Sequence, residues 1–269
     1  IDFSTPTEKS FIPLWEECTS FLKKSKTGKR NLRELSDSLL RKPFKLKKGF
    51  IDFWLPVFLF ANREDFALFD KEQYLPNITD QILELVVKNP HNYYVKAFDV
   101  EGINLKLFKM YRKLLDQKEK KPSNQGFIET VKPFLSFYKS LNPYSKNTKK
   151  LPKAALNLRE AIAKAKDPEK TFFEDFPNAL GYSRTKLSKD AKLLDLYIDE
   201  IRGSLKAIRV SYGELLDRFE MIIINFLSID KASFPNYQEV LKKRFLHVKP
   251  HFLQQRQRVF LQRINADLD

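Results

Sequence analysis

The spacing of hydrophobic residues switches from a helical to a strand-like period and back within the first hundred residues. Apolar residues that recur every three to four positions predict helices at residues 14–22, 32–40, 49–62 and 79–88. Enrichment in aromatic and β-branched side chains predicts short strands at residues 66–69, 74–75 and 93–98, with a polar turn between the first two. Residues 23–30 are polar and are expected to form a loop.

Two prolines affect where the predicted helices end, start or bend. The helix at 32–40 should end before Pro43, because a residue that precedes proline disfavours helical geometry. The helix at 49–62 contains Pro56, so we expect a kink or a late start. Over residues 31–98 the order is helix, helix, two short strands, helix and strand, which favours a winged-helix-like α+β module.

From residue 101 onward the pattern is helical throughout. A chain of 269 residues with only seven glycines and long stretches of Leu, Lys, Glu and Ala favours helices over sheets. Helices are predicted at residues 104–116, 126–141 (or from Pro133), 152–166, 188–227 (one long helix or two in tandem) and 237–264. Asp167-Pro168 should cap a short helical piece that ends at Leu180-Gly181, where glycine suits a left-handed terminus. The expected fold is mainly α, with the winged-helix-like module in a first domain (1–100) and a helical second domain (101–269).

The amino-acid composition indicates a protein with a hydrophobic core and argues against membrane-spanning and disulfide-rich classes. Hydrophobic residues make up 42 % of the chain, including 24 Phe, which is enough for a substantial core. The longest uncharged apolar run, residues 53–61, is too short to cross a bilayer, so we expect no membrane partner. A single cysteine, Cys18, excludes an internal disulfide framework and fits the cytoplasm. The chain opens on Ile1 rather than Met, and we interpret it as a region of a larger protein.

The positive charge is concentrated in two stretches. The formal net charge is +15; residues 20–50 contribute eleven Lys or Arg against two acids, and residues 118–192 seventeen against eight. Concentrated basic stretches indicate a surface that meets a polyanion, so we expect sequence-tolerant binding of nucleic acid, DNA first. The candidate phosphate-binding residues are Arg41, Lys42, Lys45, Lys47, Lys48, Lys146, Lys149 and Lys150. The alternative is that these stretches are solvated surface.

Catalytic patterns are missing from the sequence. Gly28-Lys29 lacks the upstream glycine and the following Ser or Thr of a phosphate-binding loop. His247 and His251 have metal-ligand spacing on a predicted helix, but Pro250 lies between them, and packing or capping is the preferred interpretation. Two adjacent acidic pairs, Glu16-Glu17 and Glu174-Asp175, are interpreted as surface charge beside core aromatics, because neighbouring residues on a helix point to different sides. We therefore expect no enzyme activity, no cofactor and no metal.

A second class of function stays open at this point. The chain could instead be a helical protein–protein interaction module that docks partner subunits or other domains of the same protein. The feature that would favour it is a patch of exposed aromatic residues larger than a few hundred Å².

Two parts of residues 31–181 also suggest a family. The first comprises PFKLKKGFI at 43–51 before the apolar helix, NREDFALF at 62–69 and YLP at 74–76; the second comprises residues 151–161, DPEK at 167–170 and FFEDFPNALG at 172–181. Together they resemble a non-catalytic region of large bacterial ATP-dependent phage-defence proteins of the BREX type. The resemblance implies an accessory segment and transfers no active-site residue, since the ATPase signatures of such proteins are absent from this sequence.

Overall fold

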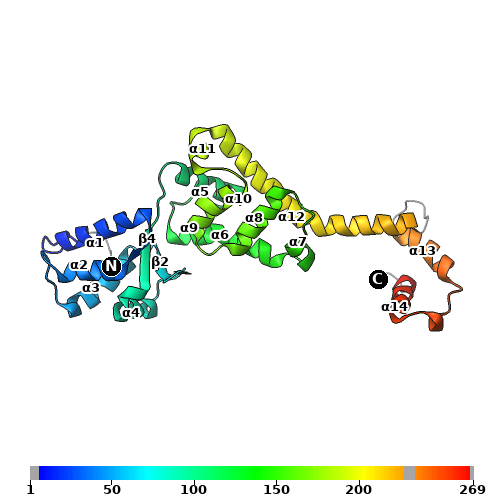
Figure 1. The fold of residues 1–269 in the computed structure, drawn as a ribbon, viewed down its shortest axis with the longest axis horizontal. Helices are drawn as coiled ribbons and strands as arrows, with labels where there is room; N and C mark the ends of the chain where they lie inside the picture. The colour runs from blue at the N-terminus through cyan, green and yellow to red at the C-terminus, as the bar shows by residue number, and fades with distance from the viewer. Residues whose placement is uncertain (1–5, 227–233, 267–269) are drawn as a thin grey trace. The chain divides into compact units, whose positions relative to one another are not determined.

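The computed structural model describes residues 6–226 and 234–266 and divides the chain into two compact units. Unit 1 covers residues 1–209 and unit 2 covers residues 210–269. Figure 1 shows a small sheet flanked by helices in the N-terminal part of unit 1, followed by a helical part. The prediction of a mainly α fold with a small β element is confirmed. None of the helices in the described ranges has the length and apolarity that a membrane span requires.

The N-terminal elements follow the predicted order. They are α1 (Ile12–Lys24), β1 (Arg30–Asn31), α2 (Leu32–Leu40), α3 (Lys48–Ala61), β2 (Phe66–Asp70), β3 (Gln73–Leu75), α4 (Asp80–Lys88) and β4 (Tyr93–Ala97). Helix α2 stops where the sequence predicts, and α3 runs through Pro56 without interruption. Thr79 caps α4 by accepting a hydrogen bond from the Ile82 N–H at 3.3 Å.

The predicted loop at 23–30 is only partly a loop. Ser25–Thr27 forms a 3₁₀ turn, and Arg30–Asn31 adds a short strand to the sheet. The buried Ser25 hydroxyl donates to the Leu22 carbonyl at 2.6 Å and accepts from the Ala97 N–H at 2.9 Å. The polar composition of this segment therefore reflects a hydrogen-bonded junction between α1 and β4, which a local pattern does not reveal.

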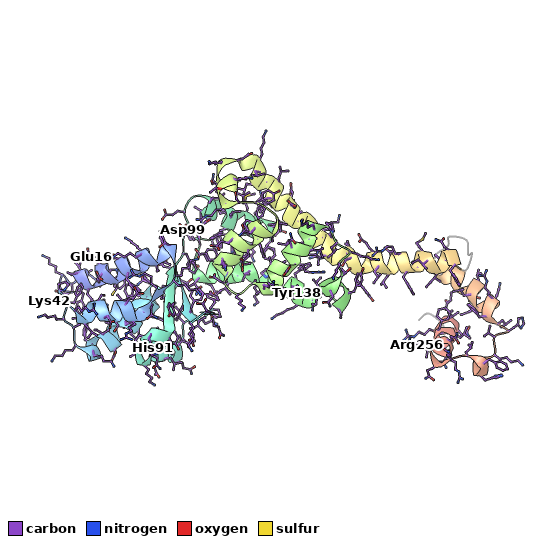
Figure 2. All side chains as sticks on the ribbon, in the orientation of Figure 1. Glu16, Lys42, His91, Asp99, Tyr138 and Arg256 are labelled. Carbon is purple, nitrogen blue, oxygen red and sulfur yellow. The ribbon has the colours of Figure 1, made fainter. Side chains whose placement is uncertain are left out.

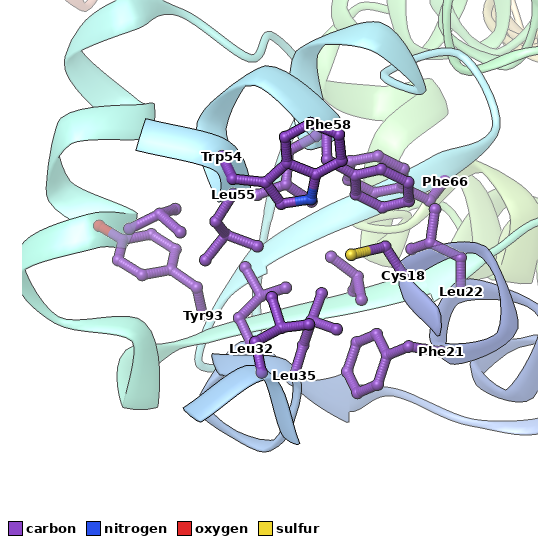
Figure 3. Close-up of a cluster of buried hydrophobic side chains, with 14 of the residues drawn as sticks. Cys18, Phe21, Leu22, Leu32, Leu35, Trp54, Leu55, Phe58, Phe66 and Tyr93 are labelled. Carbon is purple, nitrogen blue, oxygen red and sulfur yellow. The ribbon is translucent and has the colours of Figure 1, made fainter. Parts of the chain in front are cut away.

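The four strands form one antiparallel sheet in the order β1-β4-β2-β3. Phe66 and Leu68 face a first core cluster with α1, α2 and α3, whereas Ala67 and Phe69 face a second cluster built by the helices after residue 103. Figure 3 shows the first cluster around Trp54, Phe58 and the buried thiol of Cys18. Strand β2 is thus buried on both faces, because one core cluster packs against each face of the sheet. The predicted domain boundary near residue 100 falls directly after this sheet and stays a prediction.

The helical part of unit 1 begins with α5 (Ile103–Leu114) and α6 (Asn124–Ser140) and ends in α12 (Ala191–Phe226), which continues into unit 2. Between α6 and α12 lie α7 (Pro143–Asn147), α8 (Lys153–Lys164), α9 (Pro168–Lys170), the π-helical turn Thr171–Asp175, α10 (Phe176–Ala179) and α11 (Arg184–Lys189). Asp167 caps α9 through two backbone N–H groups, and Gly181 follows α10 with φ +80°, as the sequence predicts. Helix α6 begins earlier than predicted, at a Ser123 cap.

The predicted single helix at 237–264 is wrong. Unit 2 instead contains α13 (Phe234–Phe245), a 3₁₀ turn at Pro250–Phe252 and α14 (Gln255–Asn265). Pro250 lacks the N–H that a continuous helix needs and its ring clashes with the preceding turn, so the helix is interrupted there. The described core of this unit consists of Ile224, Leu241 and Ile264, with Phe245 packed against them.

Candidate nucleic-acid interface

Residues 41–48, which join α2 to α3, form an anchored loop that we call the basic loop. The Lys45 N–H donates to the Arg41 carbonyl at 2.8 Å, and the Leu46 N–H donates to the Leu39 carbonyl at 3.0 Å. Phe44 and Leu46 turn inward and pack against the first core cluster. The apolar side chains thus fix the backbone of the loop and leave its cations outside.

All five cations of the basic loop are exposed: Arg41, Lys42, Lys45, Lys47 and Lys48. In the described part of the chain, none of their side chains forms an ion pair or a hydrogen bond. Nearby cations behave differently, since Arg30 pairs with Glu34 at 2.5 Å and Lys29 pairs with Glu72 at 3.0 Å. The basic loop therefore concentrates positive charge that the fold itself does not neutralise.

The second predicted set of cations lies on a segment that is itself structured. The Asn142 side chain accepts from the Ser145 N–H at 2.8 Å and starts α7, a short helix between the two predicted at 126–141 and 152–166. The Arg159 guanidinium donates to the Ser145 and Thr148 carbonyls, both at 2.8 Å, and so holds the segment against α8. Lys146 is partly engaged, because its Nζ donates to the Lys139 carbonyl at 2.9 Å. Lys149 and Lys150 are exposed.

The two sets of cations lie in different parts of unit 1. Figure 2 shows Lys42 at the far end of the N-terminal part, whereas Tyr138, whose ring centroid is 5.7 Å from Lys146 Nζ, lies in the helical part. The structure therefore brings the five cations of the basic loop together, and separately the three near α7, but it does not merge them into one patch.

A polar pocket that the sequence did not indicate lies between the sheet and the helical part of unit 1. Its volume is about 480 Å³, and its charged lining residues are Lys26, Lys96, Lys170, Arg184, Asp99, Glu101, Glu169 and Glu174. The Glu169 carboxylate is almost fully buried, pairs with Lys96 at 2.8 Å and accepts from the Asp99 N–H at 3.0 Å. Burial raises the pKa of Glu169, against the lowering effect of Lys96.

Ion pairs account for most of the charge in this pocket. Arg184 pairs with Asp99 at 2.7 Å and Lys26 with Glu101 at 2.8 Å, in addition to the Lys96–Glu169 pair. Cations and carboxylates on its wall are equal in number, so the pocket presents no excess charge to a ligand. We interpret it as an ionic junction that ties β4 and its following loop to α9 and α11. Glu169 belongs to a segment of charged residues in the sequence, and nothing local distinguishes it from its exposed neighbours.

The structure adds no support for a metal site or a catalytic carboxylate pair at the other positions considered in the sequence. His247 and His251 are exposed and lie in the interruption between α13 and α14, outside both helices. Within the described ranges, no group of three His, Cys, Asp or Glu residues could hold a metal ion. Of the two acidic pairs, Glu16 and Glu174 are exposed and Glu17 and Asp175 are half-buried; burial raises the pKa of Asp175.

Comparison with known proteins gives no relative: no family model, no curated protein and no solved structure matches this chain.

Proposed function

We propose that this chain is a non-enzymatic nucleic-acid-binding and scaffolding region of a larger bacterial protein, of the phage-defence ATPase kind that its sequence resembles. The observation that supports the proposal is the basic loop, five exposed cations on an anchored backbone with no carboxylate partner in the described residues. Such a cluster attracts phosphates regardless of sequence and releases counterions on binding. Lys149 and Lys150, with Lys146 beside them, provide a second and weaker contact in the proposal.

Binding through these residues should be tolerant of base sequence. Arg and Lys side chains on a loop reach phosphate oxygens, which carry no sequence information. Past Lys48, the half-buried or exposed positions in the first turns of α3 include Phe50 and Phe53, and Asp52 is the one acid among them. Apart from Asp52, these side chains have no donor or acceptor with which to distinguish base pairs.

Fluorescence anisotropy with a labelled DNA duplex tests the proposal. If five phosphates are neutralised, affinity should fall by roughly 500-fold between about 50 and 200 mM NaCl. A variant with Arg41, Lys42, Lys45, Lys47 and Lys48 changed to Gln should lose most of the affinity and of the salt dependence. The matched control removes the same charge from exposed lysines elsewhere in unit 1: Lys109, Lys113, Lys153, Lys186 and Lys189. Absence of binding to both duplex and single-stranded DNA at low salt, or equal loss in both variants, would refute the proposal.

A second candidate function rests on unit 2. After residue 210, α12 exposes a series of large apolar side chains at helical spacing: Tyr212, Leu216, Phe219, Ile222 and Phe226. Phe252 is also 81 % exposed. Exposed apolar residues at this density favour docking of a protein partner.

The double variant Phe219→Asp/Ile222→Asp separates this second candidate from the first. If unit 2 docks a protein, purification from the native host should recover a partner with the wild-type chain and lose it with the double variant. The five-cation variant of the basic loop should retain that partner. Recovery of nucleic acid alone by the wild-type chain would count against a docking function.

A further inference from the structure

One exposed aromatic side chain lies in the second turn of α3, the helix that follows the basic loop. Phe53 on α3 has 64 % of its surface exposed, and among the described residues of unit 1 it is the one Phe, Tyr or Trp that is exposed to this degree. The neighbouring aromatics are engaged: Phe50 and Phe11 stack on Trp54 with ring centroids 6.2 and 5.5 Å apart. An exposed ring without a core role is unusual in a unit that otherwise covers its aromatic residues.

The helix surface on the N-terminal side of Phe53 is open at Gly49. Gly49 lies four residues before Phe53, on the same face of the helix, and a Cβ placed on it would meet no atom within 4 Å. Lys48 is the first residue of α3, so it lies about 8 Å from Phe53 along the helix axis. A flat group stacked on Phe53 would therefore lie over Gly49, about one and a half helical turns from Lys48, the last cation of the basic loop.

We propose that the basic loop and Phe53 bind single-stranded nucleic acid, with the cations at the phosphates and the Phe53 ring stacked on an unpaired base. The inference rests on the proposed function and names its substrate form. Proteins that bind single strands without sequence preference combine a basic track with aromatic faces, because every base has a face to stack on. In a duplex the bases are stacked on one another, so the Phe53 ring would have no base face to meet.

The cations and the ring together favour this ligand over an acidic peptide. An acidic peptide would satisfy the five cations, yet it needs no flat aromatic platform. A single strand supplies charge and flat apolar faces in the same repeating unit, which matches an exposed ring on the helix that begins at the last of the five unpaired cations.

Anisotropy titrations of the full chain test the inference. The probes are a labelled oligonucleotide of about 20 nucleotides without self-complementarity, the same strand in a duplex, and a labelled acidic peptide. We expect the single strand to bind more tightly than the duplex. Phe53→Ala should lower single-strand affinity by roughly 5- to 150-fold, corresponding to the loss of one stacked base, and leave duplex affinity unchanged. Phe53→Trp should retain affinity, and Phe252→Ala, which removes an exposed ring from unit 2, should have no effect. Equal thermal melting of the variants checks that the fold is intact.

Each outcome separates the inference from the proposed function. Salt-dependent binding of both nucleic acids that Phe53→Ala does not alter would overturn the single-strand inference and leave the proposed function in place. Tighter, Phe53-dependent binding of the acidic peptide would overturn the inference in favour of protein docking. If neither nucleic acid binds at low salt, the proposed function fails, and the inference fails with it.

Discussion

Lys96 and Glu169 illustrate how neighbouring groups determine the behaviour of single residues in this protein. The Glu169 side chain is 3 % exposed and the Lys96 side chain 19 %, with 2.8 Å between Nζ and Oε2. Burial acts against the charge on Lys96, but the Glu169 carboxylate outweighs it, so the pKa of Lys96 is raised; burial also raises the pKa of Glu169. Removal of one partner leaves an uncompensated buried charge, whereas an apolar replacement of both can be neutral.

Lys96→Met should therefore lower the free energy of unfolding by about 3–5 kcal/mol at pH 7, and Lys96→Met/Glu169→Leu should recover most of it. Lys26→Met is the control: it removes the more exposed pair with Glu101 and should cost less than about 1 kcal/mol. Urea denaturation measures all three. Equal costs for Lys96→Met and Lys26→Met would contradict this account of the pocket.

The directions of the two pKa shifts determine how the free energy of unfolding changes with pH. Because the folded-state pKa of Glu169 lies above its ordinary value, the folded state holds that proton more tightly, and this group lowers stability as pH rises from about 4.5 through the folded pKa. The penalty of Lys96→Met should accordingly shrink as pH is lowered from 7, because a raised pKa lets Glu169 take up a proton at a higher pH than an ordinary carboxyl group. The contribution of the raised pKa of Lys96 is present at neutral pH and is lost only as pH rises above about 10.5.

At the scale of elements, local capping explains where several helices begin. The Asn31 side chain accepts from the Arg33 N–H at 2.9 Å, and the Glu34 carboxylate accepts from the Asn31 N–H at 3.4 Å, which forms a capping box at the start of α2. The Asn31 amide also donates to the His91 carbonyl at 2.7 Å, so the same residue links α2 to the turn before β4. Pro56 and Pro133, by contrast, lie inside α3 and α6 without ending them.

Asn31→Ala should lower the free energy of unfolding by about 1–2 kcal/mol, because it removes the cap and leaves the His91 carbonyl without this donor. Asn178→Ala, an exposed asparagine on α10, is the matched control and should change stability by less than about 0.5 kcal/mol. Thermal or urea denaturation gives both values. An effect of Asn31→Ala no larger than that of the control would show that the box does not stabilise α2.

At the scale of the whole molecule, the two units differ greatly in how much core they contain. Unit 1 holds both large clusters, which share β2, whereas the cluster in the described part of unit 2 joins three buried residues, and Leu261, near Ile264 in the sequence, is also buried. Stability follows buried apolar area, so the two units should not resist unfolding equally.

Native-state hydrogen exchange should show this difference. The amides of α13 and α14 should open with free energies several kcal/mol below those of β2 and β4. Protection of α13 and α14 equal to that of the sheet would contradict the prediction, and would indicate that unit 2 is stabilised by contacts beyond its small core.

Local patterns were sufficient for most of the elements and for the cations of the candidate interface. The helices α2, α4 and α5 and the strands β2 and β4 follow from periodicity and caps, which are properties of neighbouring residues. The grouping of Arg41 to Lys48 on one loop was also predictable, because these residues are contiguous. The interruption at Pro250 was signalled by the proline itself, but the continuous apolar pattern around it led to a single predicted helix.

Contacts between residues that are distant in sequence are determined only by the tertiary structure. The Ser25 hydroxyl meets the Ala97 N–H, Lys96 meets Glu169, and β1 pairs with β4, none of which a local pattern contains. Helix α3 is the clearest case, because every residue from position 53 to position 61 is apolar. Its sequence gives Phe53 and Phe58 the same character, yet Phe58 is fully buried and Phe53 is 64 % exposed. Packing against α1, α2 and the sheet selects which face of an apolar helix is covered, and that selection leaves Phe53 exposed on the helix that follows the basic loop.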